Sequence, residues 1–398
     1  MLRFGIERLA ADPSLAKSWG RCALLCNQAS LSQKFDPAWV ILREVLGDKL
    51  KAFFGPQHGF HATLQDNMIE SEDAIGPFQL PVFSLYSQTR EPTDRMLEGV
   101  DTIVIDLQIV GCRVYTFKYT IAACLRAAKK LGKKVVVLDR PNPVGGKDIE
   151  GIVLQPHLKS FVGEFLIPLR HGLTAGEAAL FFNRDINAEL DIVKMDGWQP
   201  TRDWQQHSLP WTLTSPNLPS FDAVAVYPGT VLFEGTNISE GRGTGLPFQF
   251  IGAPYLHDAE KLVARIKHHY NWTSFENEGV FFRPAEFQPT SQKWAEQTCR
   301  GVQLHVTNPA KIRTFDLGLS ILRAFIDLCE DKVQWKQPPY EYDFHTLPLK
   351  LILGSEDIVD AITGDIFDLS SAYWKAGLTE YKQIAESLLM YDRELNIL

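Results

Sequence analysis

The sequence predicts an α/β protein in which a Rossmann-like parallel sheet, with helices on both faces, is followed by a smaller α+β domain. Three observations support this fold class: short apolar runs alternate with helical segments in the first half, polar side chains follow five such runs, and the pattern changes near residue 254. Parallel strands covered on both faces are typically continuous apolar runs. We place the Rossmann-like domain at residues 1–250 and the auxiliary α+β domain at residues 251–398.

Each element follows from a local pattern. The apolar runs interpreted as strands are residues 22–26, 51–54, 81–86, 101–107 and 134–138, with a further strand at 190–195. Helices are expected at 36–46, 119–131 and 174–183, the last with Thr174 at its cap and Glu177 at the capping-box position. In the second domain we expect helices at 258–269 and 315–328, strands at 279–282 and 301–306, and a pair of helices within 371–396.

Residues 208–244 are dense in Pro, Gly, Ser and Asn. This composition predicts long, shaped loops that carry function rather than a simple linker.

Composition excludes several classes of partner. The chain has 40 Lys and Arg against 48 Asp and Glu, a net charge of −8, whereas nucleic-acid binding needs clustered positive charge. No apolar stretch approaches the ~20 residues of a membrane span, and no secretory signal is visible at the N-terminus. The six scattered cysteines are typical of buried free thiols. We expect a cytoplasmic protein, or a periplasmic or secreted one if a leader had been removed, with no nucleic-acid or membrane partner; the oligomeric state is not predicted.

Cofactor motifs are missing from the sequence. NQAS at residues 27–30 stands where a dinucleotide-binding sheet has a Gly-x-Gly-x-x-Gly turn, and no Gly-x-x-x-x-Gly-Lys loop or Gly-x-Ser-x-Gly elbow is found. A metal set of His58, His61 and Asp106 has weak support because the histidines lie in a loop. We therefore expect neither a cofactor nor a metal.

Polar side chains gather where the predicted strands end. Ligands of open parallel sheets bind outside the carboxyl ends of the strands. The polar residues that follow the five strands include Asn27, Gln57, His58, Tyr86, Asp106, Gln108, Arg113, Tyr115, Arg140 and Asn142. Five polar strand ends in succession predict a binding site at this edge, although single members, such as Asn142 between two prolines, also suit a turn.

A second polar cluster is the segment EGTNISEGRGT at residues 234–244. It contains Glu234, Asn237, Glu240 and Arg242, and its glycines would let the backbone approach a ligand closely. An Arg–Glu pair that merely holds a loop is the structural alternative. The density of polar residues and glycines favours a functional loop.

These segments together resemble a known family. FGPQHG (54–59), DLQIVGCRVYT (106–116), DRPNP (139–143), HGLTAGE (171–177), SPNLP (215–219) and EGTNISEGRGT (234–244) are similar, in order and spacing, to motifs of the NamZ-like exo-β-N-acetylmuramidase family, long known as a domain of unknown function. The resemblance runs from about residue 5 to the C-terminus. It implies a Rossmann-like domain with a smaller auxiliary domain, and release of terminal N-acetylmuramic acid from the non-reducing end of peptidoglycan fragments.

Two positions depart from the family pattern. Gln57 replaces the Glu of Pro-Glu-His-Gly, a candidate for the catalytic acid, and Ile109 stands where Asp is common. An amide cannot donate the proton that a leaving glycosidic oxygen needs. Either another carboxyl supplies the proton, or the reaction differs, or the protein only binds.

The leading hypothesis is a glycoside hydrolase that acts on an amino-sugar or muropeptide substrate. Its candidate acid/base groups are Glu234 and Glu240, beside Gln57 and His58 in the catalytic region. Arg113, Arg140 and Arg242 are candidates for binding the lactyl carboxylate. The remaining expected substrate contacts are Asn27, Asp106, Gln108, Tyr115, Asn142 and Asn237. The alternatives are a catalytically impaired muramyl-sugar-binding protein and, with least support, a nucleotide-dependent enzyme.

We further expect eight of these residues to line one cleft: Gln57, His58, Gln108, Arg113, Asn142, Glu234, Glu240 and Arg242.

Overall fold

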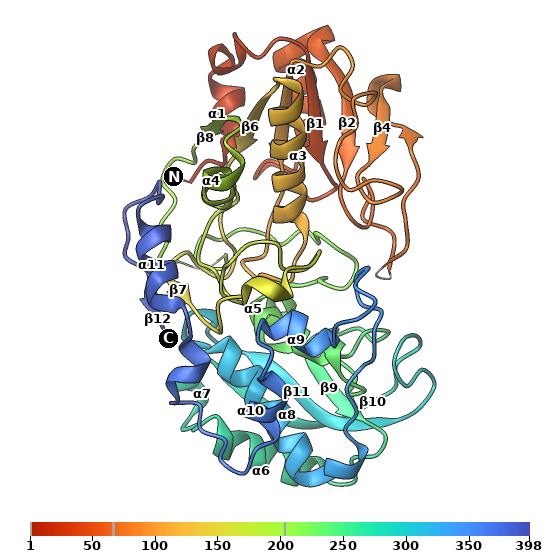
Figure 1. Ribbon diagram of the computed structural model, residues 1–398, viewed down its shortest axis with the longest axis vertical. Helices are drawn as coiled ribbons and strands as arrows, with labels where there is room; N and C mark the ends of the chain where they lie inside the picture. Colours follow the sequence, from red (N-terminus) through yellow and green to blue (C-terminus); the bar gives the residue numbers. More distant parts are fainter. Residues whose placement is uncertain (1, 66–67, 203) are drawn as a thin grey trace.

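The first half of the chain forms the predicted sheet (Figure 1). The computed structural model describes residues 2–65, 68–202 and 204–398. Seven strands lie in the order β3-β4-β2-β1-β5-β6-β8, and all neighbours are parallel except the edge pair β3–β4. The bounds are β1 (Cys22–Cys26), β2 (Leu50–Gly55), β3 (Ala74–Ile75), β4 (Pro81–Ser84), β5 (Thr102–Asp106), β6 (Lys134–Leu138) and β8 (Glu189–Val193). The predicted Rossmann-like class is confirmed.

Helices cover both faces of this sheet. On one face α1 (Gly5–Ala11) and α2 (Ala38–Leu46) pack together, and on the other α3 (Phe117–Leu131) packs on α4 (Ala175–Ile186). The Thr174 side chain accepts from the backbone of Glu177, and the Glu177 side chain accepts from the backbone of Thr174, so the predicted capping box is confirmed. Strand order reverses around β1, which places the crevice expected for a ligand beyond the carboxyl ends of β1 and its neighbours.

The second half of the chain, from helix α5 at Phe221 onward, is built on a smaller antiparallel sheet in the order β10-β11-β9. Its strands are β9 (Phe250–Ala253), β10 (Val280–Phe287) and β11 (Cys299–Val306). The helices of this half are α5 (Phe221–Thr230), α6 (Ala259–His269), α7 (Phe275–Glu278), α8 (Thr314–Cys329), α9 (Pro348–Leu353), α10 (Ile358–Thr363) and α11 (Leu378–Glu386). The predicted smaller α+β part is therefore present, while the domain boundary at residue 250 stays a prediction.

Helix α5 corrects the expectation that residues 208–244 are loops. Its ten residues are followed by a 3₁₀ turn, Val231–Gly235, and nine of the ten are buried. It crosses α8 at a glycine pair, because a Cβ on Gly229 would lie 1.9 Å from the carbonyl oxygen of Thr314, and one on Gly318 would lie 2.0 Å from that of Gly229. The glycines and Pro228, which resembled loop residues in the sequence, serve a close helix–helix contact.

The C-terminal segment also differs from its prediction. In place of a pair of helices, residues 371–396 contain a 3₁₀ turn, Ala372–Lys375, and the single helix α11; the chain then ends in β12 (Asn396–Ile397), which pairs in parallel with β7 (Asp148–Ile149). Figure 1 shows this segment returning to the first half of the molecule.

Polar contacts hold the C-terminal segment against the first half of the chain. The Arg393 guanidinium binds the buried Glu177 carboxylate at 2.5 Å, and the Tyr391 hydroxyl donates to Asp139 at 2.6 Å. The last residues are therefore part of the first half's core, although they follow the second half in sequence.

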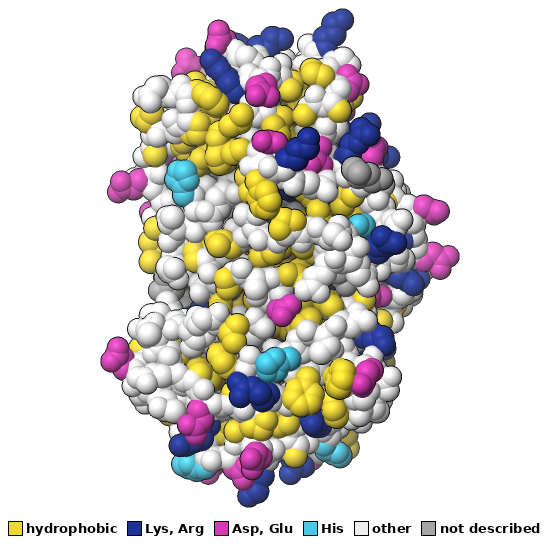
Figure 2. All heavy atoms as spheres, turned by 180° about the vertical axis from the view of Figure 1, so that it is seen from behind, with side chains coloured by type: hydrophobic (Ala, Val, Ile, Leu, Met, Phe, Trp, Pro, Cys, Tyr) yellow, Lys and Arg dark blue, Asp and Glu magenta, His cyan; other side chains and the backbone are white. Residues whose placement is uncertain are grey.

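The surface carries both signs of charge. Figure 2 shows acidic and basic side chains interspersed over the back of the molecule, with apolar side chains scattered between them. Across the part of the chain that the structure describes, no helix is long and apolar enough to span a membrane.

Candidate active site

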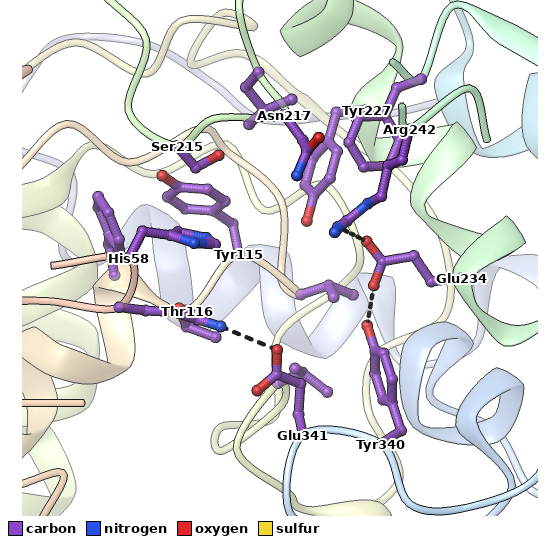
Figure 3. A pocket seen from close by; sticks show the side chains of 16 residues that line it. His58, Tyr115, Thr116, Ser215, Asn217, Tyr227, Glu234, Arg242, Tyr340 and Glu341 are labelled. Carbon is purple, nitrogen blue, oxygen red and sulfur yellow. Dashed lines mark hydrogen bonds and ion pairs between the residues drawn. The ribbon is translucent and has the colours of Figure 1, made fainter. Parts of the chain in front are cut away.

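A partly enclosed cavity lies between the first half of the chain and the segments from α5 onward (Figure 3). The loop after β2 and the start of α3 form one wall, and α5, the segment after it and residues 340–341 form the other. The lining side chains that carry polar atoms are Gln57, His58, Tyr115, Thr116, Ser215, Asn217, Tyr227, Glu234, Arg242, Tyr340 and Glu341. In Figure 3, His58 and Tyr115 lie across the cavity from Glu234 and Arg242.

The cavity brings together two of the predicted constellations. Gln57, His58 and Tyr115 come from the sheet edge, and Glu234 and Arg242 come from the 234–244 segment. Glu240 lines an adjoining cavity, which shares Glu234, Arg242, Tyr340 and Glu341 with the first. The site is therefore one connected system with a carboxyl-rich centre.

The prediction of a single cleft is wrong for Gln108, Arg113 and Asn142. The Arg113 guanidinium is fully buried and donates to the carbonyls of Ile152, Ile167 and Ile352, so it ties three backbone segments together. Gln108 donates to two backbone carbonyls and lines a different cavity, and Asn142 donates to the carbonyl of Leu173 and accepts from the backbone N–H of Val144. These polar groups satisfy buried backbone partners, which composition alone does not distinguish from a ligand site.

Four other expected substrate contacts are also engaged within the protein. Arg140 forms a buried pair with Asp106, with Nε 2.5 Å from Oδ1. The Asn27 side-chain amide donates to the carbonyl of Thr214, and that of Asn237 donates to the carbonyl of Lys332. None of the four lines the central cavity.

Glu234 and Glu240 are held by basic residues. Arg242 binds Glu234, and the Tyr340 hydroxyl donates to the second oxygen of Glu234 at 2.6 Å. Glu240 accepts from Lys293 Nζ at 2.7 Å and lies 3.4 Å from Arg242 Nε. Burial alone would raise the pKa of Glu240, but the charges of Lys293 and Arg242 outweigh it and lower that pKa below its ordinary value.

This network changes the interpretation of two residues. A carboxyl whose pKa is lowered holds no proton to donate near neutral pH, so Glu240 is poorly suited to be a catalytic acid. The charge of Arg242 is shared by two carboxylates, which leaves it a weaker partner for a ligand carboxylate than expected.

Glu341 is a site residue that sequence reasoning missed. Its carboxyl lies against Gln57, whose Nε2 donates to Oε1 at 3.0 Å, and against Tyr86, whose hydroxyl donates to Oε2 at 2.9 Å. Burial and then the nearby Glu234 charge raise the pKa of Glu341, although the hydrogen bonds from Tyr86 and Gln57 oppose the rise. It lies 284 residues from Gln57 in the chain, and no motif marked it; only the fold brings the two together.

His58 occupies a constrained loop position at the cavity wall. Its φ of 70° lies in the left-handed region that non-glycine residues rarely adopt. Nδ1 lies 2.7 Å from the carbonyl oxygen of Leu64, which only accepts, so Nδ1 carries a hydrogen. In neutral His58 the other ring nitrogen, Nε2, is therefore the acceptor.

Metal-ligating groups are a separate question. Within residues 2–65, 68–202 and 204–398, no three His, Cys, Asp or Glu side chains are grouped as a metal ion would require. The six cysteines are free, five of them buried and Cys329 half-buried.

Carboxyls that line a cavity beyond the strand ends of a Rossmann-like sheet fit the class of glycoside hydrolases, enzymes that work with paired carboxyl groups. Comparison with known proteins gives the family. Models described as exo-beta-N-acetylmuramidase NamZ, N-terminal and C-terminal, match residues 22–222 and 225–391. The chain belongs to the exo-β-N-acetylmuramidase NamZ family.

Individual relatives agree with this membership. The peptidoglycan beta-N-acetylmuramidase NamZ of Bacillus subtilis (strain 168) is 42% identical over 331 residues, covering 81% of this chain and 77% of that protein. A crystal structure of a DUF1343 family protein from Bacteroides fragilis NCTC 9343 matches with a TM-score of 0.86 and 29% identity over 98% of this chain and 99% of that one. A second protein of that family and organism shares the fold, with a TM-score of 0.74 at 24% identity, over 99% and 100% of the two chains.

Proposed function

We propose that this protein is an exo-acting β-N-acetylmuramidase that releases terminal N-acetylmuramic acid from peptidoglycan-derived fragments, and that the reaction takes place in the cavity around Glu234. The observation that carries the proposal is the 42% identity to a peptidoglycan β-N-acetylmuramidase over most of both chains. The structure adds a cavity in which two carboxyls, Glu234 and Glu341, lie together.

Glu234 suits the role of the carboxylate that faces the reacting sugar. Glycoside hydrolysis develops positive charge at the anomeric carbon, which a carboxylate in the cavity stabilises. Arg242 and Tyr340 bind one oxygen each, so they hold the carboxylate plane in a fixed orientation. His58, Asn217 and Tyr227 line the same cavity and offer hydrogen bonds to hydroxyl and acetamido groups.

The adjoining cavity is lined by three carboxyls, Glu234, Glu240 and Glu341, and by three basic side chains, of which Lys336 offers its charge to an anionic group. Lys293 and Lys336 line it beside Glu240 and Arg242. Lys293 is bound to Glu240, whereas Lys336 is exposed and, among the described residues, has no carboxylate within 4.0 Å. N-acetylmuramic acid carries a lactyl carboxylate that N-acetylglucosamine lacks, so an accessible ammonium here supports a muramyl over a glucosaminyl substrate.

Ile109, which stands where the family pattern commonly has Asp, does not affect the cavity. Its side chain is fully buried in the core and lines neither cavity. The other position that differs from the family pattern is Gln57, which replaces a glutamate. This replacement favours the second candidate function, a muramyl-sugar-binding protein with impaired turnover.

One experiment separates the two functions. Purified protein is incubated with a chromogenic β-N-acetylmuramide and, in parallel, with the matching β-N-acetylglucosaminide. An active muramidase releases the chromophore from the muramide preferentially, and Glu234→Gln abolishes release while binding of N-acetylmuramic acid persists. Binding by the unmodified protein without release would instead support the binding protein, and the absence of both would refute the two proposals.

A further inference from the structure

We propose that Glu341 is the proton donor to the leaving group, and that Gln57 is the positioning residue that holds its carboxyl in place. This assignment rests on the proposed hydrolase function and deepens it. It would explain how the chain can be active although an amide stands where the family has a glutamate.

Glu341 lies in a tight backbone turn that directs its side chain into the site. Tyr340 and Asp343 exchange two backbone hydrogen bonds, of 2.9 and 3.0 Å, so Glu341 and Tyr342 are the central residues of a tight turn. Both have positive φ, 45° and 68°, in positions that such turns usually give to Gly or Asn. Side chains kept at strained positions are concentrated at functional sites.

Contacts from both halves of the chain hold this turn in place. The Tyr340 hydroxyl binds Glu234, which connects the turn to the second half of the chain. The Arg90 guanidinium lies 4.4 Å from the Tyr342 ring and 4.3 Å from the Tyr86 ring, which connects it to the first half. Glu341 is thereby fixed between the two halves, 4% exposed and lining both cavities.

Gln57 is suited to hold this carboxyl because its own orientation is fixed. Thr116 Oγ1 donates to Gln57 Oε1 at 2.5 Å, and Gln57 Nε2 donates to Tyr86 and Glu341, so both ends of the amide are hydrogen-bonded. Tyr86 is fixed in turn, since its oxygen accepts from Met68 N and Gln57 Nε2 and its hydrogen goes to Glu341. Each carboxyl oxygen of Glu341 keeps capacity for one further hydrogen bond.

The surroundings of Glu341 shift its titration toward the protonated form. Burial and the Glu234 charge raise its pKa, whereas Tyr86, Gln57 and Arg242 lower it, and the net direction is upward. The other titratable or charged side chains that line the two cavities, among the described residues, are His58, Tyr115, Tyr227, Glu240, Lys293, Lys336 and Tyr340. A carboxyl with a raised pKa that shares a cavity with a second carboxyl is a pairing that glycoside hydrolysis uses.

The chemical step balances with these groups and water. The bond between the anomeric carbon and the glycosidic oxygen breaks, its electron pair stays on that oxygen, and the Glu341 proton moves to it. Water supplies hydroxide to the anomeric carbon, and its remaining proton returns to Glu341 through solvent. The enzyme is unchanged after one turnover.

The test compares leaving groups and pH profiles. kcat/KM is measured for a natural muramyl disaccharide and for an aryl muramide with an acidic phenol, using the unmodified protein, Glu341→Gln and the exposed control Glu330→Gln. Glu341→Gln should lose on the order of 10²–10⁴-fold on the disaccharide, and much less on the aryl glycoside, which needs little protonation. In Glu341→Gln, the fall of kcat/KM for the disaccharide at alkaline pH should disappear. Glu330→Gln should match the unmodified protein.

A second variant covers the case in which Glu341→Gln does not fold. Tyr86→Phe removes a hydrogen bond that lowers the pKa of Glu341, so the alkaline limb should move to higher pH; a merely structural role for Tyr86 would not move it. Equal losses on both substrates, or an unmoved limb, overturn the Glu341 assignment alone. No product from either substrate with the unmodified protein overturns the proposed function, and the assignment with it.

Discussion

At the scale of single residues, three glutamates share one connected site but have different neighbours. Glu240 is bound by Lys293 and Arg242, Glu234 by Arg242 and Tyr340, and Glu341 by the uncharged donors Gln57 and Tyr86. Burial would raise the pKa of Glu240, but the charges of Lys293 and Arg242 lower it, whereas burial raises the pKa of Glu341 against the opposing hydrogen bonds of Tyr86 and Gln57. This division assigns different roles to residues of one type.

Glu240→Gln should act on stability. The change leaves Lys293 without its carboxylate, although Lys293 keeps the carbonyls of Phe233 and Ile238. We expect the free energy of unfolding, measured in urea, to fall by about 3 kcal/mol, the low end for breaking a buried ion pair. The control Glu286→Gln, from the exposed pair with Arg300, should cost less than about 1 kcal/mol.

The pH dependence of the same variant has a defined sign. The folded protein lowers the pKa of Glu240 below its ordinary 4.5, so its contribution is fully present above the unfolded value and is lost as pH falls through the folded value. Unmodified protein should therefore lose stability more steeply below about pH 4.5 than Glu240→Gln. Parallel curves for the two proteins would contradict this account of Glu240.

Lys336→Gln should affect substrate binding. Loss of an exposed ammonium should raise KM for a muramide roughly two- to fivefold, the effect of about 0.5–1 kcal/mol, with kcat and the glucosaminide KM unchanged. Lys332→Gln, an exposed lysine nearby in the chain, is the control. An equal change of KM for both sugars would show that Lys336 does not bind the lactyl carboxylate.

The predicted site residues line the cavity only in part, for a physical reason. Residues that follow β2 and residues of the 234–244 segment line it, and they stood out in the sequence because polar and glycine-rich runs are visible locally. Arg113 and Asn142 were misassigned because a buried backbone carbonyl attracts the same side chains as a ligand does. Glu341 was missed because its partner, Gln57, is contributed by a distant element.

At the scale of elements, local sequence patterns predicted the strands and helices whose tertiary packing agrees with their intrinsic propensity. The strands of the parallel sheet and the capped helix α4 were predicted from continuous apolar runs and the Thr174–Glu177 pair. Helix α5 was missed because Gly229 and Pro228 lower helix propensity, while its close crossing with α8 compensates through tertiary contact.

The C-terminal segment gives a prediction at this scale. Arg393 is buried against Glu177, donates to the carbonyls of Gly146 and Gly172, and lies over Trp198. Arg393→Met should lower the free energy of unfolding by about 3–5 kcal/mol, because it leaves a buried carboxylate unpaired. Arg300→Met, which breaks the exposed pair with Glu286, should cost less than about 1 kcal/mol in the same urea titration; equal losses would show that the terminal anchor is unimportant.

At the scale of the whole molecule, the site exists only where the two halves meet. Gln57 and Tyr86 follow strands β2 and β4, Thr116 precedes α3, and Glu234, Arg242 and Glu341 come from the second half. The tight turn at Glu341 is bound to both. The fold class was predictable from alternating strands and helices, but this junction depends on how the halves pack, and sequence periodicity contains no such information.

The central claim, an exo-acting muramidase at this junction, is tested most directly with two disaccharides of opposite order. Unmodified protein is incubated with N-acetylmuramyl-β-1,4-N-acetylglucosamine and, separately, with N-acetylglucosaminyl-β-1,4-N-acetylmuramic acid, and the products are identified by mass spectrometry. The account predicts free N-acetylmuramic acid and N-acetylglucosamine from the first and no cleavage of the second. Cleavage of the second disaccharide, or of neither, would contradict it.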